Sequence, residues 1–376
     1  MVYRSLNALL VSMNLPISPA RVNYLQQAQQ YVDELMHTAH EALRQMDDAN
    51  RWLCRLWTGT TDRLWLEQVL SRHEPVSDTA LLPTLLGCLY LYRHGPPDEL
   101  LWLLLEQVNA RLYKQTAEQF ERGHVGLLTG GSTSLNYLIR AGLYAPNAQK
   151  YASQLTTQVV ESGTGSNHPI TDLSVGYGQT GLILTLTEAA TNATMAQRIV
   201  GSVREVERLI EQYVRYLANH QIPIDSQDDN WSIFPITVAE TEWTLPERFS
   251  WETGDVGQLL LLYRAHRLLN QPDLARWADR LSGYVLQRRA TNKVRVERIG
   301  LTDGMAGLSL LYRQLYRITG RADFLHEGEY WLEQLIDVVK AGRYPPDGSL
   351  QTGMLGVDAT LRHWLGEDLG LDLLFV

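Results

Sequence analysis

Cysteine is scarce in this sequence. The 376 residues contain two, Cys54 and Cys88, and neither lies in a Cys-x-x-Cys pair or beside a histidine. Two isolated cysteines exclude a zinc site of the usual thiolate type. Both lie among apolar neighbours, which favours buried free thiols over a functional role.

Basic clusters, long apolar runs and interdomain linkers are also lacking. The formal net charge is −9 and lysine is sparse, which argues against nucleic acid as the principal partner. The longest apolar runs are far shorter than a membrane span, and the N-terminus has no convincing cleavage site, so we expect a cytoplasmic protein. No stretch rich in Pro, Gly or Ser divides the chain, and strand-like alternation is scarce. The sequence therefore predicts one all-α domain over residues 1–376.

A glycine repeat is the strongest positive signal. Five Gly-x-x-Gly turns or near-variants each open an apolar run, and their first glycines stand roughly fifty residues apart, with one longer gap between Gly178 and Gly254. A degenerate sixth copy fits the spacing at Leu82 to Leu85. Fixed-period self-similarity is typical of a repeat architecture, here a ring of six helical hairpins. The five turns are Gly130-Gly131-Ser132-Thr133, Gly178-Gln179-Thr180-Gly181, Gly254-Asp255-Val256-Gly257, Gly304-Met305-Ala306-Gly307 and Gly353-Met354-Leu355-Gly356.

Two classes of helix follow from the apolar patterns. The helices that the glycines open are apolar almost all round, so we expect them inside the ring, with heavy burial at Ile183, Leu260, Leu310 and Leu361. Glycine at a helix start allows close backbone approach and leaves N–H groups exposed, so these starts should gather at one mouth. The amphipathic segments should form the outer wall: Leu25 to Met46, Asp98 to Arg122, Met195 to Leu217, Pro272 to Arg289 and Ala322 to Val339.

Two further segments complete the single domain. Residues 1–75 are predicted to add N-terminal helices to the same body. Residues 222–247 form an irregular insertion in the long gap between glycine turns. An insertion of this length is often functional, so it could fold over the cavity as a lid or peptide clamp; the alternative is a solvated surface loop.

The glycine pattern resembles the lanthionine synthetase C family, the LanC-like proteins. The resemblance covers residues 75 to 376 and is clearest in two segments. Residues 248–257, Arg-Phe-Ser-Trp-Glu-Thr-Gly-Asp-Val-Gly, resemble the family's Arg-x-x-Trp-Cys-Tyr-Gly-Asp-Pro-Gly, and residues 301–307 resemble its Cys-His-Gly-x-x-Gly. The resemblance implies an (α/α)6 toroid. It also implies an active site in which two Cys and one His hold zinc, and the metal activates a substrate thiolate for addition to a dehydroamino acid.

This sequence departs from the family at the positions that carry the chemistry. Glu252, Thr302 and Asp303 stand at the zinc-ligand positions, and Tyr177 stands where the family has a further His. A family Asp falls on Gly126, with His124 close by, and the Tyr that follows the family's first Cys is Thr253. Among the family's active-site residues Arg248 keeps its identity. We therefore expect no zinc and no other cofactor at this site.

Three functions remain open. The first is a zinc-independent lanthionine cyclase acting on a ribosomal peptide precursor, with Glu252 or Asp303 taking the thiol proton, Tyr177 protonating the enolate and Arg248 steadying it. Some kinase-fused cyclase domains of the family also lack the three ligands. The second is a catalytically inactive module that binds a peptide or a partner modifying enzyme.

The third function is a carboxylate-dependent enzyme that uses Glu252, Asp255 and Asp303. In a variant of it, the oxygens of Glu252, Thr302 and Asp303 bind a hard cation. For the peptide functions, the candidate substrate-binding residues are Trp251, Asp255, His124 and His168, the last on a loop before the Gly178 turn.

Overall fold

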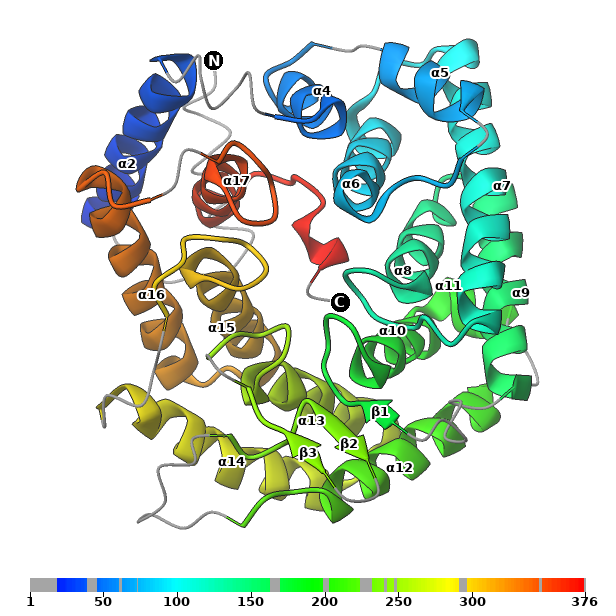
Figure 1. The fold of residues 1–376 in the computed structure, drawn as a ribbon, viewed down its shortest axis with the longest axis vertical. Coiled ribbons are helices and arrows are strands. Elements are labelled where there is room, and N and C mark those ends of the chain that lie inside the picture. Colours follow the sequence, from blue (N-terminus) through cyan, green and yellow to red (C-terminus); the bar gives the residue numbers. More distant parts are fainter. Residues whose placement is uncertain are drawn as a thin grey trace.

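The helices of this protein are arranged in a ring (Figure 1). The computed structural model describes residues 19–38, 46–60, 63–72, 74–162, 170–198, 203–223, 232–239, 242–246, 249–290, 296–344 and 347–374. The all-α toroid predicted from the sequence is confirmed, with three short strands as the exception. No helix within the described ranges has both the length and the hydropathy that crossing a bilayer requires.

The apolar helices line the inside of the ring, as predicted. Five of them begin directly after the first glycine of a repeat turn, and Ile183, Leu260, Leu310 and Leu361 are buried. The sixth differs, because it begins after Ser77, so the degenerate copy at Leu82 lies within the helix and not at its start. The inner helices are α6 (Asp78–His94), α8 (Gly131–Ala141), α10 (Gln179–Thr191), α13 (Asp255–Leu269), α15 (Met305–Thr319) and α17 (Met354–Trp364).

Amphipathic helices form the outer wall. In α12 (Val203–Asn219) the buried residues recur at steps of three and four, from Val206 through Ile210 and Tyr213 to Leu217, so one face packs on α10 and the other meets solvent. The wall also includes α9 (Pro146–Ser162), which the sequence analysis did not identify. The remaining wall helices are α7 (Glu99–Glu121), α14 (Pro272–Ala290) and α16 (Ala322–Lys340), and a short α11 (Ala193–Arg198) lies beside α10.

N-terminal helices complete the outer wall. Helix α2 (Pro19–Thr38) packs against α17, α4 (Asp48–Trp57) against α6, and α5 (Leu64–Ser71) against α7. The Gln29 Nε2 atom donates to an Asp358 carboxylate oxygen at 2.6 Å, which ties α2 to α17. The first described helix therefore closes the ring against the last inner one.

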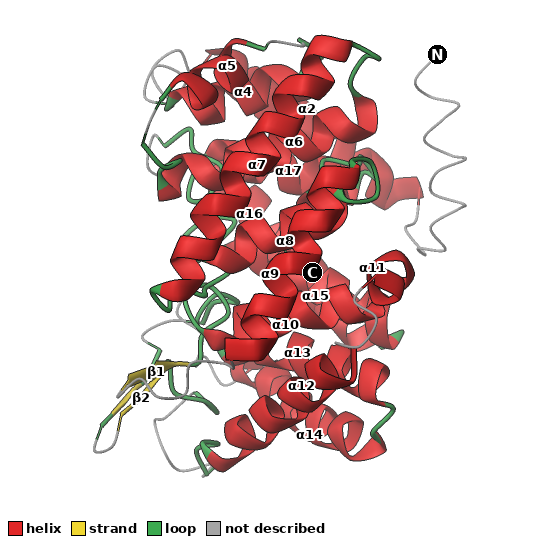
Figure 2. Ribbon diagram, turned by 90° about the vertical axis from the view of Figure 1, so that its right-hand side faces the viewer, coloured by secondary structure: helices red, strands yellow, loops and turns green. Residues whose placement is uncertain are grey.

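The strands belong to the insertion and to the segment before α10. β1 (Ile170–Asp172), β2 (Thr237–Ala239) and β3 (Trp243–Thr244) form an antiparallel sheet in the order β1-β2-β3. Figure 2 shows β1 and β2 projecting from one side of the ring. The described part of the insertion thus contains a short hairpin, and its other described residues have no regular secondary structure.

The C-terminal segment turns into the centre of the ring (Figure 1). It includes the short 3-10 helix η1 (Leu371–Leu373), which packs on α8. Leu371 and Leu373 are buried, and Asn136 on α8 donates its side-chain amide to the Leu373 carbonyl at 2.6 Å. Part of the ring's interior is therefore filled by the chain itself.

Candidate functional site

The glycines of the repeat turns are required by close packing, because each turn folds back over the helix that it opens. Four turns have a second glycine three residues after the first: Gly181, Gly257, Gly307 and Gly356. A Cβ atom on any of them would come within 3.0 Å of the carbonyl oxygen six residues earlier. The first glycines have extended backbone, so left-handed geometry is not the reason for them. We name the face where these turns gather the glycine-turn mouth, formed by residues 125–131, 173–179, 250–255, 299–305 and 349–354.

Hydrogen bonds join neighbouring turns of the mouth. The Leu128 N–H donates to the Gly176 carbonyl at 2.6 Å, and the Gly176 N–H donates to the Glu252 carbonyl at 2.8 Å. The Leu301 N–H donates to the Gln351 carbonyl at 2.7 Å. The turns are therefore held in fixed register around the ring.

Two side chains extend this series. The Trp251 indole N–H donates to the Leu301 carbonyl at 2.8 Å, which links the α13 and α15 turns. The Leu350 N–H donates to the Asn50 side-chain oxygen at 2.9 Å, which carries the series onto α4. Trp251 is 1% exposed, so it supports the mouth from inside and is not available to a substrate. We reassign it from substrate binding to this structural role.

At three of the inner helices, the first N–H group is engaged by the helix's own turn. The amides of Gly131, Met305 and Met354 each donate to the carbonyl seven residues earlier, at 2.8 to 2.9 Å. At these three starts this corrects the expectation that the first N–H group is free for a ligand, because a bonded donor gains little from a second acceptor.

Tyr177 and Glu252 form the central pair of the mouth. The Tyr177 hydroxyl donates to a Glu252 carboxylate oxygen at 3.2 Å. Tyr177 is 44% exposed and Glu252 is 8% exposed, so the pair joins a solvent-facing phenol to a buried carboxylate. The α10 turn supplies the first and the α13 turn the second. Gly126 makes this possible, because a Cβ there would come within 3.0 Å of the Tyr177 backbone.

The second carboxylate of the mouth is paired with a cation. Asp303 is buried and accepts a hydrogen bond from Arg298, which lies five residues earlier in the same turn and is exposed. Beside it, the Thr302 hydroxyl donates to the Gln351 carbonyl at 3.3 Å. The sequence analysis identified Asp303 and missed Arg298, since an arginine on a surface turn has no distinguishing pattern.

Asp255 has a structural environment that the sequence did not reveal. It is 1% exposed, forms an ion pair with Arg288 of α14, and accepts backbone N–H bonds from Ile233 and Phe234 at 3.0 Å. Its carboxylate thus anchors the insertion to the rim of the ring. These bonds remove it from substrate binding and from the set of three acids that the carboxylate-dependent enzyme requires.

Three other predicted site residues lie apart from this pair or outside the described residues. His124 is exposed at the end of α7, on the turn whose Gly126 packs against Tyr177. Arg248 and His168 lie outside the described residues, as does part of the predicted lid.

The donor set at Glu252, Thr302 and Asp303 contains neither a thiolate nor an imidazole. The two carboxylates are engaged by Tyr177 and Arg298, and the Thr302 hydroxyl is bonded to a backbone carbonyl. Across the described ranges no three His, Cys, Asp or Glu side chains come together as a metal site requires. Cys88 is buried in the core, where burial raises the pKa of its thiol to about 12.

Comparison with known proteins agrees with the fold. Neither a protein-family model nor a curated protein matches this sequence. Among solved structures, nisin cyclase superposes with a TM-score of 0.62 over 93% of this chain and 98% of its own. This chain shares its fold with nisin cyclase. At 13% sequence identity the similarity to nisin cyclase establishes the toroid and leaves the chemistry to be argued from this chain's own residues.

Proposed function

We propose that this protein binds a peptide at the glycine-turn mouth and acts in a peptide-modification system. The observation that carries the proposal is a set of large exposed side chains on the α10 turn of the mouth and on the sheet that precedes this turn. Tyr177, Trp243 and Leu245 are 44%, 46% and 40% exposed. One sheet connects them: Trp243 lies on β3 and Leu245 directly follows it, β3 pairs with β2, and β2 pairs with β1, which ends five residues before Tyr177.

The anchoring of the insertion supports this use. Bonds from Asp255 hold residues 233 and 234 at the rim, so the hairpin that carries Trp243 is presented by a fixed base. A preorganised aromatic side chain binds a peptide at a lower entropic cost than a side chain on a loose loop. The shared fold with nisin cyclase makes a ribosomal peptide precursor the natural class of ligand. A partner modifying enzyme in the cytoplasm would supply the dehydrated form.

The pairing of the carboxylates favours binding over metal-dependent chemistry. Glu252 is bonded to Tyr177, and Asp303 to Arg298. Groups bonded in this way support the shape of the mouth without needing a metal ion. We therefore favour peptide binding over catalysis as the function of the mouth.

A zinc-independent cyclase is the second candidate, and the Tyr177–Glu252 pair is the observation that favours it. In this reaction Glu252 takes the proton of a peptide cysteine, and the resulting thiolate adds to the β-carbon of a dehydrated residue. The sulfur–carbon bond forms as the double bond shifts to an enolate, and Tyr177 donates a proton to the α-carbon. Glu252 then returns the thiol proton to the Tyr177 phenolate across their hydrogen bond, which restores both groups. General acid–base catalysis of this kind contributes about 10²- to 10⁴-fold to a rate.

The experiment mixes the protein with dehydrated, cysteine-containing precursor peptides encoded by neighbouring genes. Fluorescence anisotropy measures binding, and alkylation followed by mass spectrometry measures thiol loss. We expect Trp243→Ala to weaken binding by about tenfold, as loss of an aromatic anchor does. Leu103→Ala, which truncates an exposed residue on α7, should leave binding unchanged.

Catalysis is tested with a separate pair of variants. If the protein is a cyclase, Tyr177→Phe slows thiol loss by about 10²-fold, while Tyr144→Phe, a similarly exposed tyrosine elsewhere, does not. Thiol loss at the spontaneous rate in the presence of the unmodified protein excludes the cyclase and leaves the binding proposal intact. Failure of every precursor to bind at micromolar concentration contradicts both.

A further inference from the structure

The opposite end of the ring carries a second polar set, placed by the same repeat. Arg140, Glu188, Arg264, Gln314 and His363 each lie ten residues after the first glycine of their own turn, near the C-terminal ends of consecutive inner helices. Glu188 accepts from Arg264 at 3.0 Å and lies 3.6 Å from Arg140. The repeat therefore places charged groups of successive helices within reach of one another.

A pocket of about 630 Å³ opens at this end, between α10, α13 and α15. Its charged lining residues are three arginines, Arg264, Arg267 and Arg317, and one acid, Glu188. Glu188 is already shared by Arg140 and Arg264. Arg267 and Arg317 lie exposed, and neither forms an ion pair with any residue that the structure describes. The pocket thus has an excess of positive charge in a protein whose net charge is −9.

The C-terminal segment shows that this end of the ring binds a carboxylate. Arg93 donates to the two oxygens of Asp372 at 3.1 and 3.2 Å, and Arg140 also donates to this carboxylate. Burial raises the pKa of Asp372, but the guanidiniums of Arg140 and Arg93 outweigh it and hold the pKa below its usual value. Arg140 contacts Asp372 and Glu188, so the occupied carboxylate site borders the open pocket.

Helix dipoles alone do not account for the arrangement. A cation in the last turn of a helix is favourable, and this explains Arg267 at the end of α13 and Arg317 at the end of α15. Arg264 lies one turn earlier, and burial lowers its pKa to about 10; the Glu188 carboxylate opposes this shift, and Arg140 and Arg267 add to it. An anion in the pocket would offset the mutual repulsion of these guanidiniums.

We propose that this pocket binds a small anion that carries two or more carboxylate or phosphate groups. Guanidinium groups bind both oxyanions through paired hydrogen bonds, and two exposed arginines on neighbouring helices can hold two such groups at once. The Gln314 amide lies on the lining as a further donor. The volume lies within the range of small-molecule sites.

Calorimetric titration with pyrophosphate and, separately, with citrate tests this site at constant ionic strength. Saturable binding of either probe by the unmodified protein is expected, and the stronger of the two identifies the phosphate or the carboxylate form. The double variant Arg267→Gln/Arg317→Gln should bind at least about tenfold more weakly, because the loss of even one charge-assisted hydrogen bond typically weakens binding by about this factor. Near-UV circular dichroism checks that the variant is folded.

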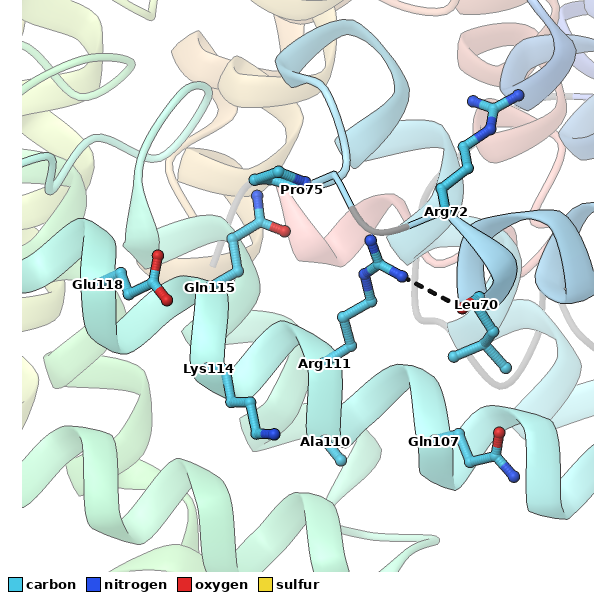
Figure 3. A pocket seen from close by; sticks show the side chains of 9 residues that line it. All are labelled: Leu70, Arg72, Pro75, Gln107, Ala110, Arg111, Lys114, Gln115 and Glu118. Carbon is cyan, nitrogen blue, oxygen red and sulfur yellow. Dashed lines mark hydrogen bonds between the residues drawn. The ribbon is translucent and has the colours of Figure 1, made fainter.

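The control uses a second pocket with basic lining residues, on the outer wall between α5 and α7 (Figure 3). It has about 600 Å³ and includes Arg72 and Lys114, so Arg72→Gln/Lys114→Gln removes the same charge elsewhere. Its third cation, Arg111, is occupied by the Val69 carbonyl at 2.6 Å. Retained binding in this control supports the site. Absence of saturable binding to the unmodified protein, or equal weakening in both double variants, overturns it.

Discussion

His363 has a more strongly perturbed environment than its sequence position suggests. It lies at the end of α17, where its backbone carbonyl accepts from Arg313 at 2.6 Å. Burial, together with the guanidiniums of Arg313 and Arg317, lowers the pKa of its imidazole to about 3 from 6.5. Since the folded pKa is below the unfolded one, its contribution to stability is complete above pH 6.5 and falls as the pH decreases toward 3.

We therefore predict that acid destabilises this protein partly through His363. Lowering the pH from 7.5 to 5 should cost about 1 to 2 kcal/mol at this residue, because the unfolded imidazole takes up a proton that the folded one does not. Urea unfolding at both pH values measures the loss. His363→Gln should lose less stability than the unmodified protein, while His326→Gln, at an exposed position on α16, should match it. Equal losses in all three proteins would contradict the prediction.

At the scale of the elements, each inner helix depends on the turn before it. The turns have no room for a side chain at the second glycine, and hydrogen bonds link them to their neighbours. A methyl group at one turn therefore disturbs two repeats. At Gly307 it would approach the Leu301 carbonyl and the indole of Trp251, which belongs to the preceding inner repeat.

Gly307→Ala should lower the free energy of unfolding by about 1 to 3 kcal/mol or more, as overpacking does. Gly283→Ala, in the middle of α14 with no atom within 4 Å of the added Cβ, should instead raise it by up to about 1 kcal/mol through helix propensity. Chemical denaturation of the two variants measures this difference in sign. If both were equally tolerated, the turns would be looser than their packing indicates.

This packing also explains what the sequence could predict. Most of the inner helices were recognisable because a steric requirement, repeated in four of the hairpins, leaves glycines at regular spacing. Helix α9 escaped notice, since its pattern is weakly apolar. The partners of Asp255 and Asp303 could not be predicted either, because Arg288 and Arg298 are fixed by the folded geometry and leave no periodic signal. The identity of the mouth was predictable, whereas the pairing within it was not.

At the scale of the whole molecule, the ring is stabilised from its centre as well as from its wall. The segment after α17 lies among α6, α8 and α17 (Figure 1). Leu373 is 0% exposed, and its carbonyl is bonded to Asn136. Because the segment contacts α6 through Arg93 and α8 through Asn136, it should unfold together with them and not as a separate flap.

Leu373→Ala should therefore destabilise the whole ring by about 2 to 4 kcal/mol, the usual cost of truncating a buried leucine. Leu103→Ala, at a residue 50% exposed on α7, should change stability by less than about 0.5 kcal/mol. Hydrogen exchange of the α8 amides reports whether the effect spreads beyond the segment. Unchanged protection of α8 in the Leu373 variant would show that the segment is an independent flap.

The contact between α2 and α17 sets a delay during biosynthesis. The apolar face of α2, with Leu25, Ala28 and Val32, leaves the ribosome long before its partner helix α17 is made. At a translation rate of about 5–20 residues per second, α2 waits roughly 15 to 60 seconds for α17. Throughout that interval its apolar face is exposed to other nascent chains and to chaperones. Slow translation of the later repeats would lengthen this exposure and lower the yield of folded protein without altering the finished ring.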